Sequence, residues 1–298
     1  MPADAWDRSL GGKFDEGQGS LCAQLEFMTR VGIAASVVYP TRSLSLGMIR
    51  EPKAASAIMN AYNELVLEYA AGAPAGAVRA AALCTPTCLA ESVRKTEAWK
   101  KDGYAALTLL PHGHDRLLGE PEFFDLYEAC EAVGLPICLH PNSNGIEGLG
   151  AFKSFVEVHT CAVPFILIRQ LISLVFGGVF ERFPKLRWLL PEAGCNWLLY
   201  WIERMDGEYR LRREETELSR PPAELLASIP LFVSAAGPEA DLDRVDAALG
   251  GGVVWASDYP HWDHSGLAHV DDLRASIPEP LFRRISWDNA ISLYGAPL

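Results

Sequence analysis

The stretch 253-VVWASDYPHWDH-264 decides the interpretation of the fold, because a short apolar run stops abruptly at a group of titratable side chains. That group consists of Asp258, His261, Asp263 and His264. A short apolar run bounded by polar and turn-forming residues is typical of a buried strand. In parallel α/β barrels the chemistry lies at the carboxyl ends of such strands. The stretch therefore predicts a buried barrel strand that delivers Asp258 to the mouth.

Short apolar runs alternate with longer amphipathic stretches along nearly the whole chain, which is the pattern of parallel βα units. The strand-like runs are 33–40, 77–84, 104–111, 135–140, 186–191, 230–235 and 252–257, and the clearest helical stretches are 54–72, 120–134 and 194–215. No repeat, low-complexity segment or linker interrupts the pattern, so we expect one domain over residues 1–298. A closed (β/α)8 barrel needs eight strands, and the pattern supplies one fewer.

The composition is that of a compact protein with a large core, with 49% hydrophobic residues and a mean hydropathy of +0.08. A net charge of -12 leaves no basic stripe for phosphates, so we expect no nucleic-acid partner. Seven scattered cysteines predict reduced core thiols and a cytoplasmic location. The apolar run 163–180 carries Arg169 and Gln170 in its middle, so we expect no membrane association.

Polar side chains follow most of the strand-like runs, which is where barrel enzymes place their functional groups. They include Tyr39 and Arg42 after the first run, His112 and His114 after the third, His140 and Asn142 after the fourth, and Glu192 after the fifth. Asp258 is either a helix N-cap or a metal ligand and general base. The intervening Pro260 and the flanking Ser257, Tyr259 and His261 favour the second role. Glu192 is either a first-turn carboxylate that complements a helix dipole or a carboxylate that points into the pocket.

Two further histidine positions allow a structural or a functional reading. His112 and His114 form a His-x-His pair, but the glycine between them predicts a surface loop. His159 lies at the start of a helical stretch and could line the pocket.

Several segments together resemble the amidohydrolase-related family that includes aminocarboxymuconate-semialdehyde decarboxylase and the dihydroxybenzoate and resorcylate decarboxylases. The segments are 38-VYPTRSL-44, 61-AYNELVLEYA-70, 135-LPICLHP-141, 177-GGVFERFPKLRWLLPEAGCNWLLYWIERMD-206, 255-WASDYPHWD-263 and 289-NAISLYG-295. The resemblance implies a distorted (β/α)8 TIM barrel of the metal-dependent hydrolase type, which holds one divalent metal, often zinc. It also implies a homodimer and a small-molecule substrate.

The resemblance also implies roles for particular residues. His140 matches a metal-ligating histidine, and Asp258 matches an aspartate that binds the metal or handles protons. Glu192 stands where many members carry a catalytic histidine. We expect Asp258, Glu192 and His261 to be catalytic. The substrate-binding candidates are Tyr39, Arg42, His112, Asn142 and His159.

The amino terminus departs from the family pattern, since members begin with a strand that bears Asp/Glu-x-His. Here 2-PADAWDRSLGGKF-14 resembles the segment after that motif, so strand 1 is missing or truncated. Either the true start codon lies upstream of Met1, or the shortened chain is the product and its metal site is weakened.

Two hypotheses follow for the function. The first is a metal-dependent hydrolase or non-oxidative decarboxylase acting on a small carboxylated cyclic or aromatic substrate. The second is a metal-free relative that binds a ligand or partner, or that performs acid/base chemistry with Glu192, Asp258 and His261.

Overall fold

A computed structural model of the chain describes residues 19–142, 152–261 and 266–296, and a seven-stranded parallel sheet runs through them in the order β1-β2-β3-β4-β5-β6-β7. The strands are β1 (Ser36–Val38), β2 (Val78–Cys84), β3 (Ala106–Leu109), β4 (Ile137–Cys138), β5 (Trp188–Leu190), β6 (Leu231–Ala235) and β7 (Val253–Trp255). Each strand lies within one of the predicted runs. The prediction of a parallel α/β barrel that is one strand short is therefore confirmed for the described residues, whereas segment 2–14 lies outside them.

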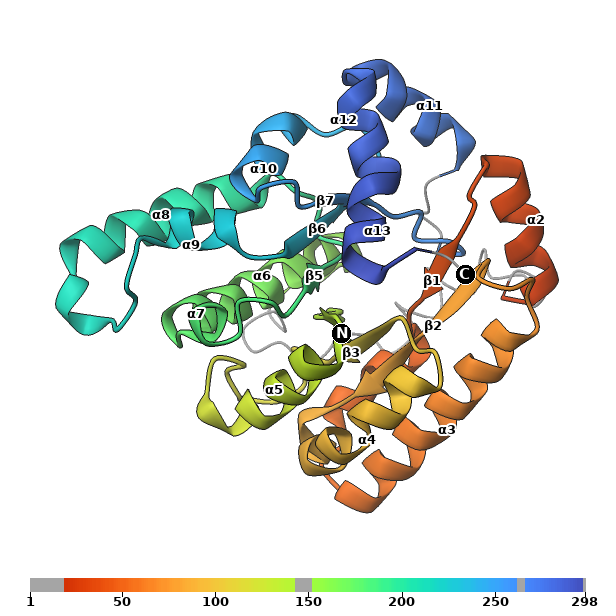
Figure 1. Cartoon of the computed structure of the whole chain (residues 1–298), viewed down its shortest axis with the longest axis horizontal. Helices are drawn as coiled ribbons and strands as arrows, with labels where there is room; N and C mark the ends of the chain where they lie inside the picture. The colour runs from red at the N-terminus through yellow and green to blue at the C-terminus, as the bar shows by residue number, and fades with distance from the viewer. Residues whose placement is uncertain (1–18, 143–151, 262–265, 297–298) are drawn as a thin grey trace.

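Helices surround the sheet on its outer side (Figure 1). They are α2 (Leu21–Val31), α3 (Pro52–Ala71), α4 (Leu89–Lys101), α5 (Phe124–Val133), α6 (Phe155–Phe176), α7 (Val179–Arg182), α8 (Trp197–Leu211), α9 (Pro222–Ser228), α10 (Leu242–Ala248), α11 (Leu267–Ser276), α12 (Glu279–Arg283) and α13 (Asn289–Tyr294). Short 3-10 turns supplement them at η1 (Arg42–Met48), η2 (Pro86–Cys88), η3 (Pro121–Phe123) and η5 (Arg213–Glu215), and a π-helical turn, η6 (Arg284–Asp288), precedes α13.

Alternate residues of the strands enter two different hydrophobic clusters, as the two-residue period of a strand requires. Ile137 and Trp188 belong to the large cluster that the strands share with the surrounding helices. A second, smaller cluster contains Cys138, Leu189 and Phe232, which occupy neighbouring positions on β4, β5 and β6. The second cluster fills the inside of the curved sheet, below the carboxyl ends of the strands.

The first and last strands do not pair with each other within the described residues, and we call the gap between β1 and β7 the seam. Figure 1 shows α13 between these two strands. Leu293 of α13 packs in the inner cluster, and the hydroxyl oxygens of Tyr294 and Tyr39 lie 2.7 Å apart. Arg79 of β2 donates hydrogen bonds to the carbonyl oxygens of Tyr294 and Gly295 at 3.2 and 3.3 Å. The end of α13 therefore bridges the seam.

Two buried asparagines bind strand backbone at positions where the adjacent strand is absent or has already ended: Val253 faces the seam, and Leu83 lies beyond Ala80, the last residue of β2 that pairs with β1. Asn289 Nδ2 donates to the carbonyl oxygen of Val253 in β7 at 2.6 Å. Asn63 of α3 donates to Leu83 O at 3.1 Å and accepts from Leu83 N at 2.6 Å. A buried backbone group without a partner is costly, so Asn289 replaces part of the ladder that is absent at the seam, and Asn63 pairs the backbone of β2 beyond the end of β1.

Helix α6 contains the one stretch among the described residues that is long and apolar enough to cross a membrane, Val156–Phe176 with a mean hydropathy of 1.7. Half of it is buried inside the protein. Its Gln170 is fully buried, accepts from Leu118 N and donates to Pro111 O, each at 2.9 Å. These contacts are typical of a core helix, and length and composition alone are weak support for a membrane span.

Candidate active site at the carboxyl ends of the strands

The first part of the site is an ion pair between two neighbouring strand ends. His140 lies two residues beyond β4 and Glu192 two residues beyond β5, and these strands pair in parallel. His140 Nε2 lies 3.2 Å from Glu192 Oε1. Although Glu192 as a residue is exposed, its side chain retains only 22% of its accessible surface, and His140 is 5% exposed. His140 Nδ1 donates to Pro141 O at 3.0 Å, which fixes the orientation of the ring.

The second part is a carboxylate and an imidazole from the loop after β7. His261 Nδ1 lies 2.7 Å from Asp258 Oδ1. The other ring nitrogen, Nε2, lies 3.1 Å from the hydroxyl of Thr41, which follows β1. Carboxylate, imidazole and hydroxyl thus form a hydrogen-bonded chain across the seam.

The two parts meet at one point. Single ligand atoms of Glu192, Asp258 and His261 all lie within 4.8 Å of one another. Two carboxylates and an imidazole suit several divalent metals. His140 lies outside this group but contacts it through Glu192.

The electrostatics of Glu192 and His140 favour the charged forms of both groups. Burial alone would lower the pKa of His140, but the Glu192 carboxylate outweighs it, so the pKa is raised. Burial would raise the pKa of Glu192, yet the imidazoles of His140, His261 and His159 together lower it. The site is therefore a compact zwitterionic cluster in which a proton has more than one place to reside.

The structure excludes the helix-end roles that the sequence left open for Glu192 and Asp258, while their metal and catalytic roles stay predictions. The first turn of α8 contains no acidic residue, and the carboxylate near its start belongs to Glu239, which accepts from Cys195 N at 2.7 Å. The residue that precedes α11 is Gly266, so Asp258 does not cap that helix. Both residues have left-handed backbone, with φ of 67° for Glu192 and 56° for Asp258.

The expectation that His112 and His114 lie in a surface loop is wrong. They are only 3% and 8% exposed. His112 Nε2 donates to Leu44 O, and His114 Nε2 donates to Leu110 O, each at 3.0 Å. The loop folds inward because its glycine, Gly113, lies against the backbone of Gly47, where an added Cβ would come within 2.5 Å. Burial lowers the pKa of His112 to about 4.

The remaining substrate-binding candidates differ in their accessibility. The ring of Tyr39 lies 5.8 Å from the ring of His140, but its hydroxyl contacts Tyr294. Asn142 is buried, His159 is half-buried on α6, and Arg42 is exposed at the start of η1. Tyr39 and His159 thus lie near the ion pair, and the substrate roles of all these residues stay predictions.

Three residues to which the sequence assigned no role contact the site directly or support it: Thr41, Ser234 and Glu239. Thr41 contacts His261, and Ser234 Oγ accepts from Glu192 N at 3.0 Å. The available signal was their position at or just beyond the ends of predicted strands, which does not reveal where a side chain points.

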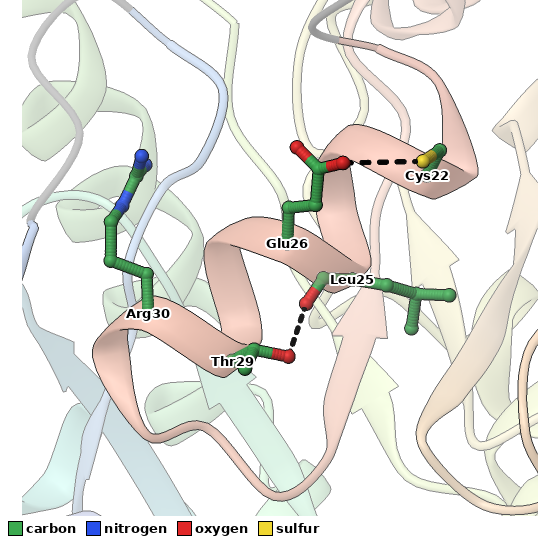
Figure 2. A pocket seen from close by; sticks show the side chains of 5 residues that line it. All are labelled: Cys22, Leu25, Glu26, Thr29 and Arg30. Atoms are coloured by element: carbon green, nitrogen blue, oxygen red, sulfur yellow. Dashed lines mark hydrogen bonds between the residues drawn. The ribbon is translucent and has the colours of Figure 1, made fainter.

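An open hollow of about 400 Å³ lies on α2 and is separate from these residues (Figure 2). Its lining consists of Cys22, Leu25, Glu26, Thr29 and Arg30. The hydrogen bond of Cys22 to Glu26 raises the pKa of this thiol, which makes it a poor nucleophile.

With the fold and the site described, comparison with known proteins gives the family. The amidohydrolase family model matches residues 23–296, and the chain therefore belongs to the amidohydrolase family.

Solved structures share the fold at low sequence identity. One is 5-carboxyvanillate decarboxylase from Sphingomonas paucimobilis, 20% identical with a TM-score of 0.78, covering 96% of this chain and 85% of that one. Another is an amidohydrolase from Mycobacterium avium subsp. paratuberculosis K-10, 20% identical with a TM-score of 0.80, covering 96% and 76%. A third is dihydroxybenzoic acid decarboxylase from Polaromonas sp. JS666 with bound manganese and the inhibitor 2-nitroresorcinol, 16% identical with a TM-score of 0.77, covering 99% and 90%.

Proposed function

We propose that this protein is a metal-dependent, non-oxidative decarboxylase of a small hydroxylated aromatic acid. The observation that carries the proposal is the meeting of the Glu192–His140 and Asp258–His261 pairs at the carboxyl ends of the strands. Family membership and the aromatic acid decarboxylases among the structural neighbours support it.

The residues present fit a divalent cation. Glu192, Asp258 and His261 would hold it, and His140 is the candidate fourth ligand. Because Pro141 O accepts the Nδ1 proton of His140, Nε2 is the nitrogen available for a cation once its own proton leaves, an arrangement common among metal-binding histidines. This donor set accepts zinc, which the resemblance favours, and manganese, which the Polaromonas enzyme binds.

When bound, such a cation supplies positive charge that orients the carboxylate and hydroxyl oxygens of a substrate. The protein's own groups manage the proton. The proton shared by Asp258 and His261 can pass to the ring carbon as the bond to the carboxylate breaks. The electron pair of that bond forms the new C–H bond, and CO2 leaves. Glu192 supplies negative charge at the cation site, and the hydrogen bond from Nδ1 of His140 to Pro141 O keeps its ring oriented toward Glu192.

The same proposal includes a cytoplasmic homodimer with no nucleic-acid or membrane partner. The composition supports these parts, with its net charge of -12 and its seven cysteines. The dimer rests on the family resemblance.

The test uses chelator-treated protein that is reloaded with Mn²⁺ or Zn²⁺ and incubated with mono- and dihydroxybenzoates labelled with ¹³C in the carboxyl group. We expect labelled CO2 and bicarbonate only with metal. Asp258→Asn and Glu192→Gln should each lower the rate by roughly 100-fold or more, since each removes a group that handles protons or charge.

The matched control is Asp241→Asn, because Asp241 is also an aspartate with left-handed backbone (φ 59°) but lies outside the cluster. It should leave the rate unchanged. Decarboxylation that survives complete metal removal would contradict the proposal, as would hydrolysis of esters or amides with no decarboxylation of any acid in the panel.

A further inference from the structure

The Glu192 turn, residues 191–196, presents the Glu192 carboxylate to His140 from an unfavourable backbone conformation. Glu192 has a φ of 67°, in the left-handed region that residues with a Cβ rarely adopt. Gly194, two residues later, has the same φ. A turn of this kind relaxes unless neighbouring groups hold it. The 3.2 Å contact of Glu192 with His140 therefore requires an external restraint.

Two side chains from a single neighbouring element supply that restraint. Ser234, on β6 and only 5% exposed, accepts from Glu192 N at 3.0 Å. Glu239, in the loop between β6 and α10, accepts from Cys195 N at 2.7 Å. One bond lies at each end of the turn, so β6 and its loop fix both the entry and the exit of the turn.

The approach of Glu239 depends on a missing side chain. A Cβ at Gly194 would lie 2.9 Å from Glu239 Oε2 and 3.3 Å from its Cδ. The Glu239 carboxylate also faces the amino-terminal end of α8, where negative charge is favourable. Only glycine at position 194 therefore leaves room for the Glu239 carboxylate at Cys195 N.

We propose that Ser234 and Glu239 are positioning residues that hold the Glu192 turn, so that the Glu192 carboxylate stays in contact with His140 and within reach of Asp258 and His261. The inference rests on the proposed function, because it assumes that Glu192 takes part in the cation site.

The first readout needs no metal. The protein is labelled with ¹⁵N-histidine and treated with chelator, and the NMR chemical shifts of the His140 ring nitrogens are recorded. Glu192→Gln removes the charge that faces His140, so its spectrum gives the shift change expected when the contact is lost. Glu239→Ala should move the His140 signals in the same direction, and Gly194→Ala should do so too, because its Cβ displaces the Glu239 carboxylate. Glu239→Gln keeps an oxygen that accepts from Cys195 N and should leave the signals near those of the wild type.

The matched control is Glu181→Ala. Glu181 also accepts a backbone hydrogen bond, from Ser219 N at 3.0 Å, but in another loop. It should leave the His140 signals unchanged.

The second readout is Co²⁺ binding, followed by visible absorption. Glu239→Ala should weaken Co²⁺ about tenfold, as changes around metal ligands do. The same change in a Glu192→Gln background should have no further effect. A residue that only stabilised the fold would lower the melting temperature and leave both readouts unchanged.

The outcomes separate the two proposals. Absence of Co²⁺ binding by the wild type would contradict the proposed function, while the His140 signals would still decide the positioning role. His140 signals unchanged in both Glu239→Ala and Ser234→Ala would overturn the positioning role, even if the wild type binds Co²⁺.

Discussion

The two sides of the barrel mouth are held by different kinds of bond. On the paired side, His140 and Glu192 follow strands joined by a continuous parallel ladder, and their separation follows from the backbone. At the seam there is no ladder between β1 and β7 in the described residues. There, side chains join the parts, as Thr41 does with His261 and Tyr39 with Tyr294.

This difference predicts where the molecule is vulnerable. A backbone ladder survives the replacement of any one side chain, but a side-chain bond is lost with a single substitution. We therefore expect substitutions at the seam to cost more than chemically equal ones elsewhere.

The largest effect is expected for Asn289→Ala at the seam. The change leaves the buried carbonyl of Val253 unpaired and removes one partner of the buried Asp246 carboxylate. We expect a loss of about 3 kcal/mol in the free energy of unfolding, measured by urea denaturation. Asn60→Ala is the matched control, because its amide bonds to the half-buried Glu91 between α3 and α4. That change should lower the free energy of unfolding by about 1 kcal/mol or less. Equal losses for Asn289→Ala and Asn60→Ala would contradict the expectation that the seam is more sensitive to substitution.

A smaller effect is expected on the paired side, from the pH dependence of His112. Its pKa is lowered to about 4 by burial, whereas an unfolded histidine titrates near 6.5. Between these values the unfolded chain holds the extra proton, so stability falls as the pH falls through this window. We expect His112 to contribute a loss of about 2 kcal/mol from pH 7.5 to 4.5, which His112→Gln removes. Burial also lowers the pKa of His114, so a part of the slope with the same sign remains in that variant.

His269→Gln is the control for this effect, because His269 is exposed. Stability measured by urea denaturation across the same pH range should keep its wild-type slope in that variant. If His112→Gln does not change the dependence of the free energy of unfolding on pH, His112 takes up its proton in the folded protein as it does in the unfolded chain.

The smallest effect is expected for Tyr39→Phe, which removes one hydrogen bond across the seam. The loss should be about 1 kcal/mol, and it should vanish in a Tyr294→Phe background because the two hydroxyls are each other's partners. Tyr62→Phe is the control, since its buried hydroxyl has no hydrogen-bond partner among the described residues and its removal should cost little. Equal losses in the free energy of unfolding for Tyr39→Phe and Tyr62→Phe would show that the hydrogen bond between Tyr39 and Tyr294 does not stabilise the seam.

The sequence predicted the elements of the fold better than the contacts between them. Seven strands and the polar residues after them follow from apolar runs and turn residues, which are local properties. The burial of His112 depends on the close approach of Gly113 and Gly47, which lie far apart in the chain. No local pattern encodes such an approach.

The same limit applies to the site. The strand ends identified His140, Glu192, Asp258 and His261, because parallel strands bring their carboxyl ends to one edge. The partners of Glu192 could not be found in this way. A serine near the end of a strand and a glutamate in the loop after it are ordinary residues until Ser234 accepts from Glu192 N and Glu239 accepts from Cys195 N.

We propose that a divalent cation binds where the two carboxylate–imidazole pairs meet. The most direct test is an anomalous difference map from crystals of the full chain grown with Mn²⁺. We expect one strong peak in contact with Glu192, Asp258 and His261, and loss of that peak in Glu192→Gln. A map with no peak at these residues, or with its strongest peak elsewhere on the protein, would contradict it.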